Sequence, residues 1–101
     1  MSSYKKLVRD KIPELLDSKG IAYEKYIASP DEYKVELIKK LQEEIVEFAE
    51  AGSPEEFADI LEVIEALQKL SDYRGVVALQ QKKRDERGGF EKRIILKGEK
   101  G

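Results

Sequence analysis

Acidic side chains dominate one stretch of the sequence, residues 43–62, which reads EEIVEFAEAGSPEEFADILE. Eight of its twenty positions are Asp or Glu and none is Lys or Arg, although the whole chain has 19 Lys+Arg and 21 Asp+Glu. Neighbouring carboxylates repel one another and lose hydration when they are partly buried. A divalent cation relieves both costs, and a set of oxygen ligands favours Mg²⁺, with Mn²⁺ as an alternative. The first chemistry that these residues indicate is therefore metal binding.

The composition removes most other kinds of site. The chain has no Cys and no His, which excludes thiolate catalysis, Cys-based zinc sites, Ser-His triads and nearly all transition-metal sites. Carboxylate, amine, guanidinium and hydroxyl groups remain. A net charge of −2 and a pI near 5.3 give no overall attraction to polyanions. We therefore expect no nucleic-acid partner.

The two ends of the chain suggest a simple organisation. The N-terminal stretch MSSYKKLVRDK is charged, and no apolar run approaches membrane-spanning length. We expect no signal peptide and no membrane partner, and a cytoplasmic location. A length of 101 residues predicts one domain over 1–101, with a frayed tail at 97–101.

Two capping boxes predict the central helices. SPDE (29–32) and SPEE (53–56) each place Ser at the N-cap, Pro at the first helical position and Glu at the third. They predict helices over 30–51 and 54–71. Because only two residues separate these helices, we expect them to fold back as an antiparallel hairpin.

Weaker signals complete the predicted fold. Apolar periodicity indicates further helices near 10–18 and 72–87. Residues 21–27 (IAYEKYI) and 90–96 (FEKRIIL) are candidates for a small two-stranded β ribbon, although two strands alone are marginal. The expected fold class is mainly all-α, a hairpin or bundle of about four helices.

Helical periodicity predicts where the acids point. At 100° per residue, Glu44 and Glu47 fall on one border of the apolar face of the first central helix, and Glu56 and Asp59 on a border of the second. Across the turn, Glu47 matches Glu56 and Glu44 matches Asp59, so four carboxylates can meet at two adjacent levels between the helices and hold metal, with the number of ions left open. In the alternative interpretation they are solvated surface groups, and Glu56 only completes its capping box.

Several stretches are also similar to a known family. EIVE (44–47) and EFAD (56–59), on consecutive helices, resemble the metal-binding signature of the MazG-like superfamily of all-α nucleoside triphosphate pyrophosphohydrolases. KLVRDKIP (6–13) and ERGGF (86–90) resemble a short, single-domain branch labelled phosphoribosyl-ATP pyrophosphohydrolase-like. The gap between the two acidic pairs is shorter than in many MazG proteins, which implies a tighter hairpin. The chain also has no His, Cys or Trp, so base recognition must use other groups and the substrate stays open.

The resemblance implies a function. It implies Mg²⁺-dependent hydrolysis of a nucleoside triphosphate, with non-canonical nucleotides included, to a monophosphate and pyrophosphate in a house-cleaning role. Glu44 and Glu47 would be catalytic carboxylates as well as metal ligands. The resemblance also implies a homodimer or homotetramer of helical bundles. Val35 and Val46, which lie off the main apolar face, independently indicate a second buried surface.

Two groups of cations are candidates for substrate binding. Lys83 and Arg87 stand one turn apart just before two glycines, which would let a ligand approach the backbone closely; they could instead complement a helix dipole. Lys6 and Arg9 form the second group. In the alternative interpretation Asp10 caps the first helix and Arg9 makes an ordinary surface ion pair.

A function of another class also fits the acidic stretch. A non-catalytic helical interaction module could use the same acidic face to bind a basic partner protein. Divalent ions should stabilise a metal enzyme against heat but leave such a module unchanged.

Overall fold

The computed structural model describes residues 5–99, and in this range every regular element is helical. The elements in chain order are α1 (Ile12–Ser18), α2 (Pro30–Ala51), α3 (Pro54–Gln68), the short 3₁₀ helix η1 (Ser71–Tyr73) and α4 (Val76–Arg87). The predicted all-α fold class is confirmed. None of the helices in the described range has an apolar stretch long enough to cross a membrane.

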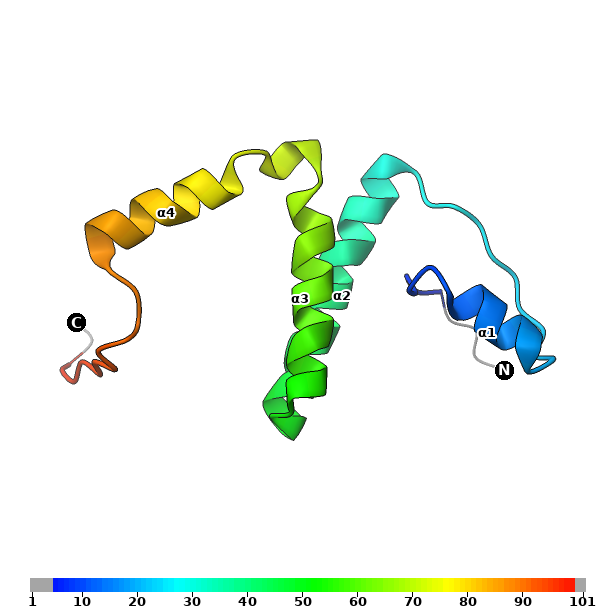
Figure 1. Ribbon diagram of the computed structural model, residues 1–101, viewed down its shortest axis with the longest axis horizontal. Helices are drawn as coiled ribbons and strands as arrows, with labels where there is room; N and C mark the ends of the chain where they lie inside the picture. The colour runs from blue at the N-terminus through cyan, green and yellow to red at the C-terminus, as the bar shows by residue number, and fades with distance from the viewer. Residues whose placement is uncertain (1–4, 100–101) are drawn as a thin grey trace.

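Both predicted serine N-caps form. The Ser29 hydroxyl accepts a hydrogen bond from the backbone N–H of Glu32 at 3.2 Å, and the Ser53 hydroxyl accepts one from that of Glu56 at 3.3 Å. Gly52 ends α2 with a φ of 63°, a left-handed conformation that glycine adopts without strain. These local signals fold α2 and α3 into the antiparallel hairpin at the centre of Figure 1.

The core of the hairpin is thin. Its buried apolar side chains are Leu37 on α2 and Ile60 and Val63 on α3. Near the turn, the rings of Phe48 and Phe57 meet edge to face with their centroids 5.3 Å apart. Among the described helices, α2 and α3 are the only pair with an extensive packing interface.

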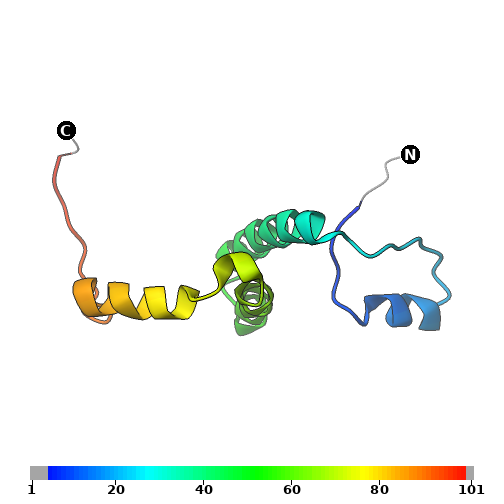
Figure 2. The ribbon, with the colours of Figure 1, turned by 90° about the horizontal axis from the view of Figure 1, so that it is seen from above.

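The other helices extend away from this hairpin. Figures 1 and 2 show α4 leaving one side of it and α1 lying on the opposite side, joined to α2 by an extended connection. The radius of gyration is 18.3 Å, whereas a compact chain of this length has about 13 Å. The arrangement of a single chain is therefore open.

The predicted β ribbon is wrong for the described residues. Neither 21–27 nor 90–96 forms a strand, and the two segments lie at opposite ends of the molecule (Figure 1). Strand formation needs a partner with unpaired backbone groups, and the hairpin separates these two segments. Residues 97–99 have no regular structure, and the end of the predicted frayed tail, 100–101, lies outside the described residues.

Candidate metal centre

Three carboxylates converge on one side of the hairpin. Glu44 comes from α2 and Glu56 and Asp59 come from α3, and one carboxylate oxygen of each lies within 4.8 Å of the others. The tight turn sets the register of the two helices, which brings residues at similar distances before and after it to the same level. The structure thus brings together three of the four predicted ligands.

Two of these carboxylates have a buried oxygen without a partner. Glu44 is only 5% exposed, and its Oε1 forms an ion pair with Lys40 Nζ at 3.1 Å, one turn earlier on α2. Within the described residues, Oε2 of Glu44 and Oε2 of Glu56 are buried and have no hydrogen-bond partner. Burying such an oxygen costs desolvation free energy that no hydrogen bond offsets. A bound cation would offset this cost.

Glu47, the fourth predicted ligand, lies at the rim of this group. Its side chain is exposed. On the helical wheel of α2, Glu47 lies further than Glu44 from the face that packs on α3. Repulsion by the Glu44 carboxylate raises the pKa of Glu47, and a hydrogen bond with Glu44, burial and the nearby Glu56 act in the same direction. Glu47 therefore holds a proton more readily than an isolated glutamate.

Two cations from outside the acidic stretch 43–62 also reach the carboxylates. Lys40 lies just outside the acidic stretch in sequence. Arg9 comes from the N-terminal segment: its Nη2 donates to Asp59 Oδ1 at 2.7 Å, and its Nη1 lies 3.9 Å from Glu62 Oε1. The spacing of Lys40 and Glu44, one helical turn, is visible in the sequence, whereas no local signal identifies Arg9 as a neighbour of Asp59.

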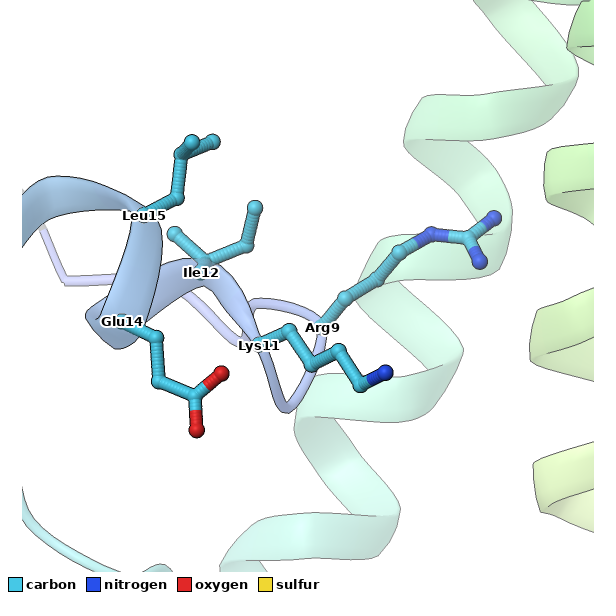
Figure 3. Close-up of a pocket in the computed structure, with 5 residues that line it drawn as sticks. All are labelled: Arg9, Lys11, Ile12, Glu14 and Leu15. Carbon is cyan, nitrogen blue, oxygen red and sulfur yellow. The ribbon is translucent and has the colours of Figure 1, made fainter. Parts of the chain in front are cut away.

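An open hollow lies beside α1 and is shown in Figure 3. Its lining residues are Arg9, Lys11, Ile12, Glu14 and Leu15. The figure shows the Arg9 side chain extending away from α1 toward the hairpin. The backbone leading into α1 therefore positions a guanidinium at the edge of the carboxylate group. Asp10 does not cap α1, because the N-cap residue is Lys11.

Two of the remaining predicted cations lie elsewhere. Lys83 and Arg87 line an open hollow at the end of α4 together with Gly88 and Phe90. Because α4 extends away from the hairpin (Figure 1), the two cations are not at the carboxylates of their own chain. Lys6 is exposed, three residues before Arg9.

Comparisons of the chain with protein-family models, with curated proteins and with solved structures find no match. The resemblance to MazG-like enzymes therefore stays a prediction that depends on the motifs quoted above. What the chain does has to be argued from the carboxylate group and the side chains around it.

Proposed function

We propose that the hairpin carboxylates hold Mg²⁺, or Mn²⁺ in its place, and that the protein is a metal-dependent nucleoside triphosphate pyrophosphohydrolase. The observation that carries the metal proposal is that Glu44 and Glu56 each have a buried oxygen without a partner and that one carboxylate oxygen of each of these residues and of Asp59 lies within 4.8 Å of the others. Buried oxygen atoms of this kind are expected where a ligand completes the site.

The donor set fits a hard divalent cation. All three groups are carboxylates on rigid helices, and Mg²⁺ prefers oxygen ligands in a fixed arrangement. Lys40 forms an ion pair with one oxygen of Glu44, and the other oxygen has no hydrogen-bond partner. Glu47 at the rim would add a further oxygen with a small rotation of its exposed side chain. Glu44, Glu56 and Asp59 are thus the proposed ligands, with Glu47 beside them.

The groups at the site would have separate roles in the reaction. When bound, Mg²⁺ would neutralise phosphate oxygens and make a coordinated water more acidic. Arg9 presents guanidinium donors beside Asp59, and guanidinium binds phosphate well. Glu47 has an exposed carboxylate at the rim of the proposed ligands, so it is the group that would accept a proton from the attacking water.

The substrate class comes from the resemblance of 44–47 and 56–59 to the MazG-like signature. In the proposed reaction the water oxygen bonds to the α-phosphorus, and the bond from that phosphorus to the bridging oxygen breaks. Pyrophosphate leaves with the bridging oxygen, and the nucleoside monophosphate remains. The water proton passes to Glu47.

The experiment that tests this function is a nucleotide panel. The protein is incubated with canonical and modified nucleoside triphosphates and Mg²⁺, and released pyrophosphate is measured. We expect release for at least one nucleotide, lost in Glu47→Gln and retained in Glu50→Gln, a matched change at an exposed position of the same helix. Metal binding without pyrophosphate from any nucleotide would overturn the enzymatic proposal while keeping the metal site.

A second candidate function is favoured by the ion pairs of Lys40 and Arg9. These show that the acidic side of the hairpin accepts protein cations, as a non-catalytic module binding a basic partner would require. Such a module would bind a Lys- or Arg-rich peptide with strong salt dependence. Divalent ions would not raise its melting temperature, which separates it from the metal enzyme.

A further inference from the structure

The N-terminal segment, residues 5–11, is strongly cationic. Four of its seven residues (KKLVRDK) are Lys or Arg and one is Asp. Its Arg9 side chain reaches the carboxylate group of the hairpin, where it pairs with Asp59 at 2.7 Å and lies 3.9 Å from Glu62. Charge attraction therefore contributes to holding this segment against the hairpin.

Burial contributes little to this attachment. Every residue between 5 and 18 is exposed or half-buried, and α1 has no buried residue. The side chains of Arg9 and Asp59 are 55% and 40% exposed. An ion pair as exposed as this one shifts an equilibrium by no more than about five-fold. A modest change in the charge of the carboxylate group is therefore enough to detach Arg9.

A second ion pair holds the beginning of the segment. Lys5 Nζ lies 3.3 Å from Glu32 Oε2 in the first turn of α2, and the Tyr26 hydroxyl donates a hydrogen bond to the same oxygen at 2.8 Å. The Lys5–Glu32 pair closes residues 5–32 into a loop, which Figure 2 shows beside the start of α2. Arg9 fastens this loop to the carboxylate group. Losing the Arg9 contact would free the loop there and leave the hairpin folded.

A divalent cation and Arg9 compete for the same carboxylates. Asp59 is the partner of Arg9 and also one of the three proposed metal ligands. In the metal-free chain the negative charge of the group attracts the guanidinium. A bound dication would neutralise this charge and would repel the guanidinium, because the two lie within the screening distance of about 8 Å in physiological salt.

We propose that metal binding releases the N-terminal segment and α1 from the hairpin, so that Arg9 acts as a tethered competitor of the metal. This inference rests on the metal site of the proposed function and adds its regulation. By linkage, the metal weakens the attachment of the segment by the same factor as the attachment weakens metal binding. The exposed ion pair limits this factor to about five-fold. Arg9 then becomes available to nucleotide phosphates only after the metal has bound.

A distance measurement on the whole protein tests the release. Because the chain has no Cys, two spin labels can be placed through Glu14→Cys on α1 and Glu65→Cys on α3, both at exposed positions. Dilution with unlabelled protein restricts the measured distances to pairs within one chain. In EDTA we expect one dominant, narrow distance. Saturation with Mg²⁺ should lower the ratio of attached to detached chains by up to about five-fold.

Calorimetry on the same samples separates the two ways in which this test can fail. If Mg²⁺ binds and the distances do not change, the release is overturned and the metal site stands. If Mg²⁺ does not bind, the metal site and the release fall together. Raising the NaCl concentration in EDTA should also detach the segment, because its ion pairs are exposed. This second measurement needs no metal, and distances that do not respond to salt would contradict attachment through Arg9.

A matched pair of variants tests whether Arg9 is the competing group. Arg9→Gln and Lys11→Gln each replace a cation by an amide in the same hollow, and Arg9 is the one that pairs with Asp59. In EDTA, Arg9→Gln should already have the low attached share of the native chain in Mg²⁺. Lys11→Gln should respond to Mg²⁺ as the native chain does. An Arg9→Gln chain that is still attached in EDTA and released by Mg²⁺ would contradict the proposal.

The second oxygen of Asp59 offers an alternative with opposite consequences. Asp59 could bind the metal through Oδ2 while Oδ1 keeps its hydrogen bond from Arg9, so that Arg9 would orient a metal ligand. In that case Mg²⁺ would raise the share of attached chains, and Arg9→Gln would weaken Mg²⁺ binding. Either result would overturn the release.

Discussion

Arg9 donates a hydrogen bond from Nη2 to Oδ1 of Asp59 at 2.7 Å, although fifty residues separate them in sequence. This contact ties the N-terminal segment to α3 at the carboxylate group. It also places a permanent positive charge where the proposed metal and substrate would bind. The Arg9 and Asp59 side chains are 55% and 40% exposed, so the pair should add no more than about 1 kcal/mol to the free energy of unfolding.

The first prediction concerns this arginine. Arg9→Gln should increase the affinity for Mg²⁺ several-fold, because it removes a cation that competes for Asp59, and should raise the KM for the nucleotide, because it removes a phosphate donor. Calorimetric titration and steady-state kinetics measure the two effects. Lys11→Gln, a neighbour in the same hollow (Figure 3), is the control. Weaker Mg²⁺ binding in Arg9→Gln would contradict the role given to Arg9.

The second prediction concerns Lys40. Lys40→Met should lower the free energy of unfolding of the metal-free protein by about 1–3 kcal/mol, because it leaves both oxygens of the buried Glu44 without a cation. Mg²⁺ should restore most of this loss. Urea denaturation with EDTA and with Mg²⁺ measures both quantities.

Lys39→Met is the matched control for that variant, because Lys39 pairs with Glu36 at the surface and should change stability little. If Lys40→Met lowers the free energy of unfolding equally with and without Mg²⁺, then Lys40 stabilises the helix independently of a metal.

The third prediction concerns the pH dependence of Glu47. Its pKa is higher in the folded chain than its ordinary value of 4.5, chiefly because of Glu44, so the folded chain binds this proton more tightly than the unfolded chain. The contribution of Glu47 to the free energy of unfolding therefore falls as pH rises from 4.5 through the raised pKa. Glu47→Gln should remove this decline in metal-free protein.

Denaturation in EDTA across that pH range, for the native chain and for Glu47→Gln, measures the difference between the two slopes. Identical slopes would contradict the repulsion between Glu44 and Glu47. The same variant should lose on the order of 10²- to 10⁴-fold in kcat if Glu47 accepts the proton.

Local signals in the sequence predicted the part of the fold that positions the site. The two Ser-Pro capping boxes and Gly52 act over a few residues, so they could be found without knowing any distant contact. The short turn then fixed the register that brings Glu44, Glu56 and Asp59 together. Elements without such signals were placed less well: α4 begins at Val76, several residues later than expected.

Features that depend on distant contacts could not be predicted in this way. The contact of Arg9 with Asp59 depends on how the N-terminal segment lies against the hairpin, which no local pattern encodes. The β ribbon failed for the same reason, because strand propensity at 21–27 and 90–96 is insufficient without a nearby partner. Glu47 was expected among the ligands, but its further rotation around α2 leaves it at the rim.

The most direct test of the metal centre is a calorimetric titration of Mg²⁺, repeated with Mn²⁺, into the protein freed of metal with EDTA. We expect saturable binding that is lost in both Glu44→Gln and Glu56→Gln and kept in Glu50→Gln. If neither ion binds, or if binding is kept in both Glu44→Gln and Glu56→Gln, the assignment of the hairpin carboxylates as a metal site is contradicted.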